Sequence, residues 1–566
     1  MKRPSHVDPS KDERRSRAPY NFVALPADII SVPVGGPGSG IVEHDRYVPG
    51  RHTGWIDISM TTETPLFVRC APPAQHGDDI DDKRDVHRRH FFHHGDESRP
   101  VIPGSSIRGM VRSLVEIMAY GKMQWVSDKA LVYRAVGDRS SLGEAYRTMM
   151  LGRNQSHMPN REMKFDYPAH QLSGGYLERK GSDWFIRPAK TYEGESFIHV
   201  RYEDVEKTIG GRGRQRVHDI YVVPTKRVSS SRGNRGNKAL ILNLTIAQQV
   251  SFEPKEGYVH AKLVESGHMG KPIGQPPDPH QKHMHCAIYD PDPNAEPIPI
   301  PFQMWARYME DLAISRGERT KTRCLSGHEE PLFYLLDDSG DLVFFGPTML
   351  FRVPYRCTIH SYIPEHLRRP SETDLAEAMF GAVGDSTSHS RSTNPAVRGR
   401  MFFEDAIWDG QGGNPFLEGD EGFRTPKILS SPKPTAFQHY LVQTQPNDRG
   451  TLCHYDSGPD ATEIRGHKLY WHKKGVPDSD IFEPALVTDP RDTQHTIIRP
   501  VKPGTIFTGR IRFENLNDEE LGALLSAVDL PPSKRHKLGM GKPYGMGSVR
   551  ISCSLQLTDR QVRYSR

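Results

Sequence analysis

Hydrophobic and polar residues alternate along three stretches that lie near the two ends of the chain. In residues 56–61 the isoleucine and methionine positions alternate with acidic or hydroxyl side chains. Residues 507–513 and 549–557 repeat this two-residue period, and the polar positions of the former include two arginines. Such a period places one face of a strand against a core and the other toward solvent. The pattern therefore predicts three half-buried strands.

Two stretches show the three-to-four-residue spacing of an amphipathic helix. The first follows Pro103-Gly104, where Ser105 or Ser106 can cap it by accepting backbone N–H bonds. Its apolar positions are Ile107, Met110, Val111, Leu114, Val115 and Met118. The second begins with Asn517 and Glu520, which have the spacing of a capping box. Its apolar stripe is formed by Leu521, Leu524, Leu525 and Val528.

These elements predict an α+β fold whose core is built from both ends of the chain. A strand, a capped helix, a glycine-rich loop and a strand follow one another near the C-terminus, and they make half of a ferredoxin-like fold. The strand at 56–61 and the helix at 105–118 begin the other half. We therefore predict a ferredoxin-like core formed by residues 20–120 and 341–566.

The remaining segments are less regular. Residues 1–19 mix charged residues with Ser and Pro, and we expect them to be flexible. Residues 121–340 contain a strand-like alternation at 240–246 and a helical spacing at 304–312, which predicts a large α+β insertion. Residues 410–445 are rich in Gly and Pro, which predicts either a projecting hairpin or an ordinary long surface connection.

The composition of the whole chain does not indicate a partner. The 566 residues include 75 basic and 70 acidic side chains, a net charge of +5, so only local clusters could attract a nucleic acid. No apolar run approaches the ~18–20 residues of a membrane span. The N-terminus also lacks the apolar region of a signal peptide. We expect a soluble, cytoplasmic protein without a membrane partner.

The first local cluster is the turn that precedes the helix at 105–118. Ser105 and Ser106 offer hydroxyls, and Arg108 and Arg112 stand four residues apart, near a helix end that attracts anions. This combination suits a phosphate backbone. The alternative is an ordinary capped core helix with solvated arginines.

The second cluster is a glycine-rich loop at 538–548. Its candidate contacts are Lys537, Gly539, Gly541, Lys542, Tyr544, Gly545 and Gly547. The glycines allow the backbone to approach a ligand closely and to turn its N–H groups outward as an anion nest. The lysines add charge, and the tyrosine adds a ring on which a base could stack. The spacing fits neither a Walker loop nor a dinucleotide-binding fingerprint.

A third basic stretch lies inside the predicted insertion. Residues 207–238 contain nine Lys and Arg residues against one acidic residue, Asp219, and glycines interrupt the stretch. Such a segment cannot bury itself. It is either a solvated loop or a flexible arm that RNA phosphates order, and the other basic clusters favour the arm.

Residues 71–100 are dense in charge and contain two sets of candidate catalytic groups. The acidic candidates, which could hold Mg²⁺ or orient a water on RNA, are Asp78, Asp79, Asp81, Asp82 and Asp85. The histidines, which could act as general acid and base without a metal, are His87, His90, His93 and His94. The alternative is a solvated loop, which is what charge runs usually form.

A zinc site has only scattered candidates. They are His283, His285, Cys286, Cys324 and His328, whose side-chain types suit Zn²⁺ but whose spacing is irregular. The six cysteines of the chain include no C-x-x-C pair. Buried thiols in a reducing compartment are the alternative.

Four segments, taken in order, resemble one protein family. They are residues 102–109, residues 375–381 followed by 398–406, residues 431–440, and the loop at 538–548. Together they resemble the RAMP superfamily of CRISPR-associated proteins, and most closely the long backbone RAMP subunits of type III-D and the related type VII effector complexes. The resemblance covers roughly residues 20–120 and 340–560.

This resemblance implies a function. It implies a ferredoxin-like, RRM-like core, a thumb-like hairpin at about 410–445, and binding of a guide RNA by its backbone while the bases pair with target RNA. Further copies of the chain, head to tail, and other effector subunits would be partners. Arg398, Arg400 and Lys433 join the candidate RNA contacts.

Three functions remain open at this point. The chain could bind the guide RNA without chemistry of its own, which needs no cofactor. It could also cut target RNA with Mg²⁺ held by the aspartates at 78–85, as related type III subunits do with a loop aspartate. A third possibility is a guide-processing endoribonuclease that uses the histidines at 87–94.

Overall fold

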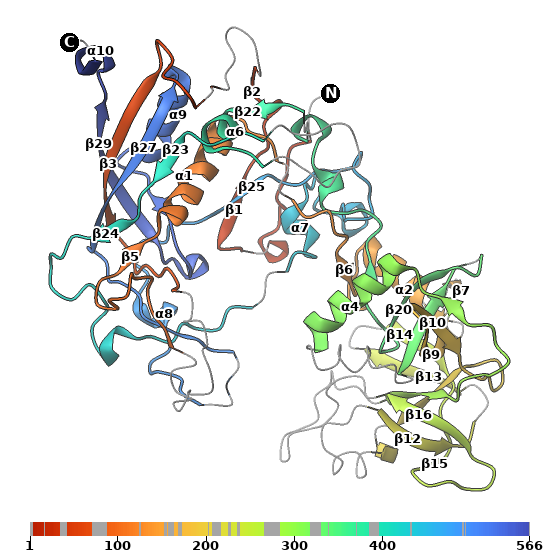
Figure 1. Cartoon of the computed structure of the whole chain (residues 1–566). Helices are drawn as coiled ribbons and strands as arrows, with labels where there is room; N and C mark the ends of the chain where they lie inside the picture. Colours follow the sequence, from red (N-terminus) through yellow and green to blue (C-terminus); the bar gives the residue numbers. More distant parts are fainter. Residues whose placement is uncertain are drawn as a thin grey trace. The chain divides into compact units, whose positions relative to one another are not determined.

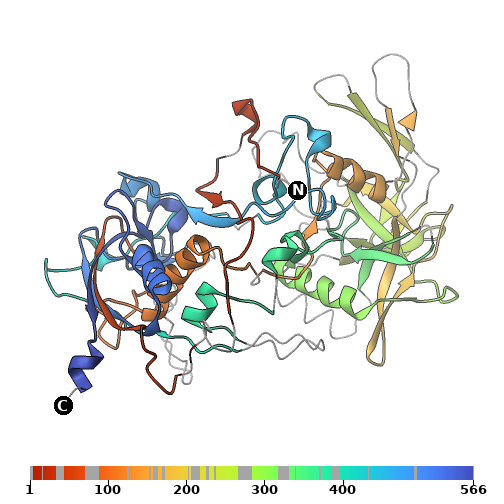
Figure 2. The same ribbon diagram turned by 90° about the horizontal axis from the view of Figure 1, so that it is seen from above.

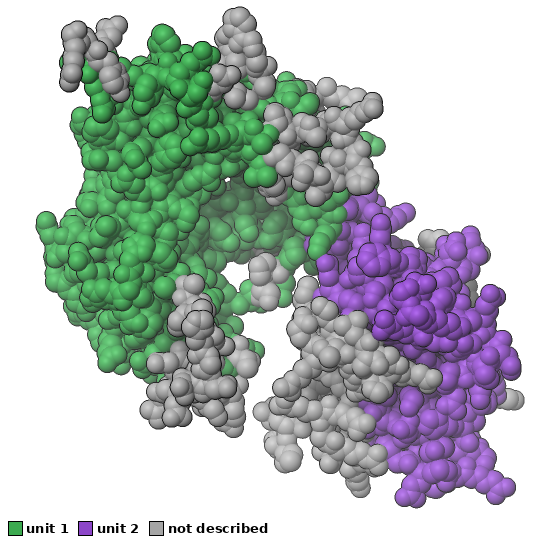
Figure 3. Space-filling view, in the orientation of Figure 1, with its two compact units in different colours: residues 1–129, 359–444, 457–566 green, residues 130–358, 445–456 purple. Residues whose placement is uncertain are grey.

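The computed structural model describes residues 4–15, 17–33, 42, 44–70, 88–123, 126–151, 155–156, 164–167, 172–201, 203–205, 217–224, 228–234, 238–264, 284–316, 330–337, 339–368, 371–383, 396–430, 433–489, 492 and 494–564. The chain divides into two compact units (Figure 3). Unit 1 comprises residues 1–129, 359–444 and 457–566, and unit 2 comprises residues 130–358 and 445–456. Within the described ranges, no helix has the length and apolar character needed to cross a membrane.

The core of unit 1 is an antiparallel sheet built from both ends of the chain. Its long strands are β3 (His52–Thr62), β27 (Ile506–Leu516) and β29 (Ser548–Leu557), and β3 pairs with both others. The short strands are β5 (Val101–Ile102), β23 (Met401–Phe403), β24 (Ala406–Trp408) and β28 (His536–Lys537). The strand order is β28-β29-β3-β27-β24-β5, and β23 also pairs with β27.

Two helices complete this fold. Helix α1 (Gly104–Met118) follows β3 along the chain, and α9 (Asp518–Val528) connects β27 to β29. Both lie on the same face of the sheet (Figures 1 and 2). Along the chain, the core elements follow in the order β3, α1, β24, β27, α9 and β29. In the sheet, β29 and β27 flank β3, and β24 lies beyond β27, which is the ferredoxin-like arrangement. The predicted α+β, ferredoxin-like core is confirmed.

The two-residue period of the strands decides which sheet face is covered. Ile56, Ile58 and Met60 of β3 are at most 3% exposed, and they share one hydrophobic core with Val111 of α1 and Leu524 of α9. Complete burial of one such side chain contributes about 1.5–3 kcal/mol. The residues between them in β3 are only half-buried, because no helix of the described residues covers the opposite face.

The start of α1 differs from the prediction. The helix begins at Gly104, and neither Ser105 nor Ser106 caps it. The Gly104 N–H instead donates to Oδ1 of Asp405 at 2.7 Å, a carboxylate 301 residues further along the chain. A Cβ at position 104 would collide with the carbonyl oxygen of Phe403, so a glycine is needed there. The capping box of α9 is confirmed, with Glu520 N donating to Asn517 Oδ1 at 2.8 Å.

Shorter elements surround the core of unit 1. Three two-stranded pairs are β1 (Tyr20–Val23) with β25 (His467–Tyr470), β2 (Ser31–Val32) with β22 (Thr373–Asp374), and β4 (Arg88–Arg89) with β26 (Ile497–Ile498). The helices are α6 (Leu375–Phe380), α7 (Phe437–Tyr440), α8 (Asp478–Ile481) and α10 (Arg560–Tyr564). The 3-10 helices are η1 (Asp12–Arg14), η3 (His360–Tyr362), η4 (Glu365–Leu367), η5 (Asp420–Gly422) and η7 (Lys542–Tyr544).

Residues 410–445 differ from the predicted projecting hairpin. In the described residues 410–430 and 433–445, no two strands of the segment pair with each other. Its backbone bridges connect it to residues outside the segment: Phe416 pairs with Val501, and Arg424 pairs with Ile498. Phe416 is 1% exposed and belongs to the core of unit 1. Buried aromatic side chains thus hold part of this segment against the core, as in the alternative of a long connection.

Unit 2 consists mainly of strands. One sheet, in the order β18-β10-β9-β19-β20, contains β9 (Leu172–Lys180), β10 (Asp183–Pro188), β18 (Ile298–Pro299), β19 (Pro331–Leu336) and β20 (Leu342–Gly346). A second, in the order β11-β17-β16-β12-β15, contains β11 (Phe197–Arg201), β12 (Val217–Val222), β15 (Val250–Ser251), β16 (Val259–Val264) and β17 (Met284–Tyr289). A third, in the order β13-β14-β8-β7, contains β7 (Gln155–Ser156), β8 (Lys164–Tyr167), β13 (Val228–Asn234) and β14 (Lys238–Leu244).

Unit 2 also contains the pair β6 (Val132–Tyr133) and β21 (Val353–Pro354), the helices α2 (Ser141–Leu151) and α4 (Phe302–Arg316), and the 3-10 helix η6 (Arg449–Thr451). β14 and α4 cover most of the predicted strand at 240–246 and all of the predicted helix at 304–312. The basic stretch 207–238 is not one continuous loop, because β12 and β13 occupy part of it. Seven of its nine basic residues lie outside the described residues: Lys207, Arg212, Arg214, Arg216, Lys226, Arg227 and Arg235.

Candidate nucleic-acid interface

The two segments predicted to contact RNA lie at one end of the unit 1 sheet. Helix α1 starts after the C-terminal end of β3, and the glycine-rich loop precedes β29, which runs antiparallel to β3. Backbone bonds connect the two segments in steps: Met540 N donates to Phe67 O, Phe92 N to Val68 O, and Val101 N to Phe92 O, each at 2.8 Å. The residues after β3 and those around Phe92 therefore connect the glycine-rich loop to the turn before α1 at this end of the sheet.

The glycine-rich loop folds back on itself. All four of its predicted glycines have positive φ, between 69° and 114°. Gly539 is further restricted, since a Cβ there would lie 2.5 Å from the carbonyl oxygen of Phe67. The N–H groups of Met540, Tyr544, Gly545 and Gly547 all bond to carbonyl oxygens within the chain. These four N–H groups do not form the predicted outward nest, so any attraction for anions must come mainly from side chains.

Three lysines supply that attraction, and we call Lys473, Lys537 and Lys542 the lysine cluster. The Nζ of Lys537 donates to Gly545 O at 3.0 Å and to the Ser548 hydroxyl at 3.1 Å. Lys473 Nζ donates to Pro543 O at 2.8 Å. Burial first, and then the charges of Lys473 and Lys542, lower the pKa of Lys537 to about 8.

The lysine cluster has no compensating carboxylate among the described residues. No ion pair of the described chain includes any of its three members, whereas Arg535 nearby pairs with Glu63 at 2.6 Å. Burial also lowers the pKa of Lys542. Lys537 and Lys542 are half-buried, and Lys473 is exposed. Half-buried cations near other positive charges gain free energy when an anion binds between them. The cluster is thus a candidate site for a phosphate group.

A histidine lies beside the lysine cluster. His472 Nδ1 lies 2.9 Å from the hydroxyl of Ser548, which also accepts from Lys537. Burial and then the charge of Lys537 lower the pKa of His472, so this ring is neutral at pH 7. The sequence analysis missed His472 and Lys473. Their run Trp471-His472-Lys473-Lys474, aromatic and then basic, is the signal that could have identified them.

At the other segment, Ser105 is exposed and Ser106 is half-buried. The neighbouring arginines are used within the fold. Arg108 donates to Phe380 O at 2.6 Å, and Arg112 donates to Glu116 at 2.7 Å and to Gly381 O at 3.4 Å. These bonds attach α1 to the end of α6. The phenylalanine and glycine of the 375–381 motif therefore serve as acceptors for the two arginines, which keep only part of their surface for a ligand.

Arg400 is withdrawn from the candidate contacts. Its side chain is 3% exposed, and its guanidinium donates to both carboxylate oxygens of Glu520, one at 2.8 Å, and to Ala378 O at 3.1 and 3.2 Å. Arg400 thereby ties α6 to the capping box of α9 and cannot reach a ligand. Arg398 and Lys433 are exposed.

The other candidate groups are only partly described. The aspartates at 78–85 and His87 lie outside the described residues, as do His283, Cys324 and His328. His285 and Cys286 lie buried in β17 of unit 2. Among the described residues, no three His, Cys, Asp or Glu side chains are grouped so that they could hold a metal ion.

Two described histidines of the charged segment, His94 and His90, have carboxylate partners. His94 Nε2 lies 2.7 Å from Oδ2 of Asp405, whose other oxygen caps α1. His90 lies 3.2 Å from Glu97. The Asp405 side chain therefore links an exposed histidine to the start of α1, which the sequence did not reveal because the two residues are 311 positions apart.

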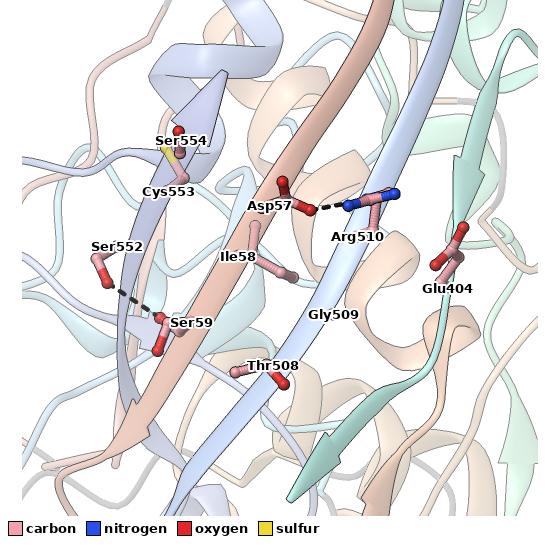
Figure 4. A pocket seen from close by; sticks show the side chains of 10 residues that line it. All are labelled: Asp57, Ile58, Ser59, Glu404, Thr508, Gly509, Arg510, Ser552, Cys553 and Ser554. Atoms are coloured by element: carbon pink, nitrogen blue, oxygen red, sulfur yellow. Dashed lines mark hydrogen bonds and ion pairs between the residues drawn. The ribbon is translucent and has the colours of Figure 1, made fainter. Parts of the chain in front are cut away.

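The uncovered face of the sheet carries a shallow hollow of about 570 Å³ (Figure 4). Hydroxyl side chains from three neighbouring strands line it, among them Ser59, Thr508 and Ser552. Asp57 and Arg510 form an ion pair of 2.7 Å across two of these strands. This pairing leaves the hollow with little uncompensated charge, so it is a weaker candidate for RNA than the lysine cluster.

Three comparisons with known proteins were informative to different degrees. The model of the RAMP superfamily matches residues 59–244, which run from the end of β3 through α1 into unit 2. A comparison with curated proteins gives no match. Among solved structures, a chain of the type III-B Cmr-beta complex bound to cognate target RNA is similar at 10% identity and a TM-score of 0.18, over 89% of this chain and 98% of that chain. A structural similarity of that size carries no argument about this protein.

Proposed function

We propose that this chain is a RAMP-superfamily protein that binds the sugar-phosphate backbone of RNA as a subunit of a CRISPR effector complex. The observation that carries the proposal is the lysine cluster. It places three cations without a described counter-charge at the end of the core sheet where α1 also begins. Backbone recognition leaves the bases free to pair, as a guide RNA requires.

The guide RNA is the ligand we propose, and complementary target RNA pairs with it. Several copies of the chain would follow one another along a guide, together with other effector subunits. Ser105, Ser106, Arg108, Arg112, Arg398 and Lys433 are proposed as further contacts to the RNA. Binding of this kind needs no metal ion. The family match supports this proposal, and the lysine cluster gives it a location.

The test is the salt dependence of RNA binding. We expect the triple variant Lys473→Ala, Lys537→Ala and Lys542→Ala to bind single-stranded RNA more weakly at every salt concentration. The slope of log K against log salt should fall by about 2, because each phosphate contact to a single strand contributes about 0.7. Fluorescence anisotropy with a labelled 20-nucleotide RNA measures both quantities.

A matched control replaces three exposed lysines of unit 2, Lys180, Lys190 and Lys255, by alanine. This variant loses the same formal charge and should keep the slope of the wild type. If both triple variants change the slope equally, binding is diffuse and the lysine cluster is not the site. A purified protein that carries no RNA and does not bind any at low salt would contradict the whole proposal.

A second candidate function is cleavage of the bound RNA, and the His94–Asp405 pair favours it. An aspartate that orients a histidine is the usual arrangement of a general base, here beside the start of α1. His94 would take the proton of a ribose 2′-hydroxyl as that oxygen attacks the adjacent phosphorus. The P–O5′ bond then breaks to leave a 2′,3′-cyclic phosphate, and the leaving 5′-oxygen takes a proton from water. Cleavage that persists in EDTA and disappears in His94→Ala supports this function, and cleavage that EDTA abolishes assigns the chemistry to a metal instead.

A further inference from the structure

Strands β1 and β25 form a small ribbon that carries aromatic residues. They pair antiparallel, with Tyr20 opposite Tyr470 and Phe22 opposite Lys468. Because strand side chains alternate, these four side chains share one face of the ribbon. Figure 1 shows the two strands side by side in unit 1. We call this face the aromatic ribbon.

The rings of the aromatic ribbon lie within contact of one another yet stay accessible. The ring centroids of Tyr20 and Tyr470 are 5.9 Å apart, and those of Tyr20 and Phe22 are 5.8 Å apart. Tyr440 of α7 adds a fourth ring, 5.9 Å from Phe22, and its hydroxyl lies 3.2 Å from that of Tyr20. All four residues are half-buried and none belongs to the buried core.

Two cations lie over these rings. Lys468 Nζ is 5.0 Å from the ring centre of Tyr20 and 5.4 Å from that of Tyr470, and the Arg465 guanidinium is 5.0 Å from that of Phe22. Arg465 donates to two uncharged acceptors, His439 O at 3.4 Å and Asn21 Oδ1 at 3.3 Å. The carboxylate of Asp8 interacts electrostatically with Arg465, and this carboxylate also pairs with His6 at 3.4 Å. Partly exposed rings interleaved with cations are the chemistry that holds single-stranded nucleic acid.

The aromatic ribbon continues directly into the lysine cluster. The chain leaves β25 at Tyr470, passes Trp471, which is 52% exposed, and reaches Lys473 three residues later. Three extended residues span at most about 10 Å. His472, between them, is held at Ser548 beside Lys537. Nucleotides adjacent to a phosphate at the lysine cluster are therefore within reach of the rings.

We propose that the aromatic ribbon is a stacking platform for unpaired bases of the RNA whose backbone the lysine cluster binds. The inference rests on the proposed RNA-binding function and adds a second element to it. The phosphates bind through charge, and one or two bases without a pairing partner stack on Tyr20, Tyr470 and Phe22. The chain therefore prefers RNA with unpaired bases to RNA without bases.

The experiment compares two RNAs on the full-length protein. One is a 20-nucleotide single-stranded RNA, and the other has the same length and phosphates but abasic sites in place of all bases. We expect the wild type to bind the first about tenfold more tightly, the size of one stacked base. In the double variant Tyr20→Leu and Tyr470→Leu, the affinity for the first RNA should fall to that for the abasic RNA. Tyr470→Phe, which keeps the ring, should bind both RNAs as the wild type does.

The outcomes separate the two proposals. Equal affinity of the wild type for both RNAs overturns the stacking platform and leaves the proposed function intact. A preference for bases that survives in the double variant places stacking elsewhere and also overturns it. Binding of neither RNA overturns the proposed function itself.

A second measurement needs no variant, which matters if the double variant fails to fold. RNA that carries 5-iodouridine is crosslinked to the wild type by ultraviolet light, and the crosslinked peptides are identified by mass spectrometry. We expect crosslinks within residues 20–22 and 468–471. Crosslinks confined to other peptides would overturn the inference.

Discussion

At the scale of single residues, the sequence identified charged side chains but not the tasks that they perform. Arg400 and Lys537 were both candidate RNA contacts. Arg400 is buried against Glu520, whereas Lys537 is only half-buried and has cations for neighbours. Sequence reasoning cannot separate the two cases, because the partner of Arg400 lies 120 residues away. Burial and partners therefore decide which arginine or lysine remains available to a ligand.

Glu520 should be one of the most sensitive residues of unit 1. Its carboxylate accepts from Arg400, lies 3.4 Å from Arg51 and completes the capping box of α9. Glu520→Gln leaves the guanidinium of Arg400 buried without a carboxylate, which typically costs about 3–5 kcal/mol of the free energy of unfolding. Urea unfolding followed by fluorescence measures the change. Glu519→Gln, an exposed change in the same helical turn, should alter that free energy by less than about 0.5 kcal/mol.

Lys537 should make RNA binding depend on pH. Its pKa of about 8 in the folded chain lies below the ordinary 10.5, so the free protein loses this charge as the pH rises above 8. A bound phosphate favours the charged form, and the affinity for RNA should therefore fall above pH 8, by at most about tenfold per pH unit for one proton. In the variant Lys537→Arg the side chain keeps its charge, so the fall in RNA affinity that Lys537 causes between pH 8 and 9 should disappear.

The same lysine affects stability in the opposite direction. Between pH 8 and 10.5 the unfolded chain holds a proton at Lys537 that the folded chain has released. The contribution of this residue to the free energy of unfolding therefore rises with pH across that window. A titration in which RNA affinity and stability fall together above pH 8 would contradict the assignment to Lys537.

At the scale of elements, regular periods were predicted well and distant contacts were not. The strands β3, β27 and β29 and the helix α9 follow from their apolar periods and from the local capping box at Asn517. The start of α1 was predicted wrongly, because its cap is Asp405 rather than a nearby serine. Residues 410–445 carry turn signals throughout, but buried aromatic residues such as Phe416 pack part of the segment on the core. The lysine cluster combines two segments, of which the sequence analysis found one.

Asp405 should stabilise α1 as a helix cap does. Asp405→Ala leaves the Gly104 N–H without its acceptor and should cost about 0.5–2 kcal/mol of the free energy of unfolding. Asp405→Asn keeps a side-chain oxygen that can accept this bond and should lose less. Urea unfolding of both variants checks the order, and hydrogen exchange of the Gly104 amide should be faster in the alanine variant alone. An alanine variant with unchanged exchange would show that the cap contributes nothing.

At the scale of the whole molecule, the ends of the chain build unit 1 and most of the middle builds unit 2. Each unit has its own hydrophobic core. One core includes Ile58 and Ile511 and lies entirely in unit 1, and the other includes Ile198 and Ile220 and lies entirely in unit 2. All residues of the lysine cluster and of the aromatic ribbon belong to unit 1. RNA binding as proposed is thus a property of the ferredoxin-like unit.

Separate cores predict separate unfolding transitions. Differential scanning calorimetry should resolve two transitions, because each core loses its packing as one cooperative unit. Ile511→Ala removes a side chain that is 1% exposed in the core of unit 1, and it should lower one transition by the equivalent of about 2–5 kcal/mol. Ile220 is fully buried in the other core, and Ile220→Ala should lower the other transition.

Bound RNA should raise only the transition that Ile511→Ala lowers, since a ligand stabilises the unit that binds it. A single transition that both variants shift alike would show that the two cores unfold together, and RNA stabilisation of the other transition would place the binding site outside unit 1.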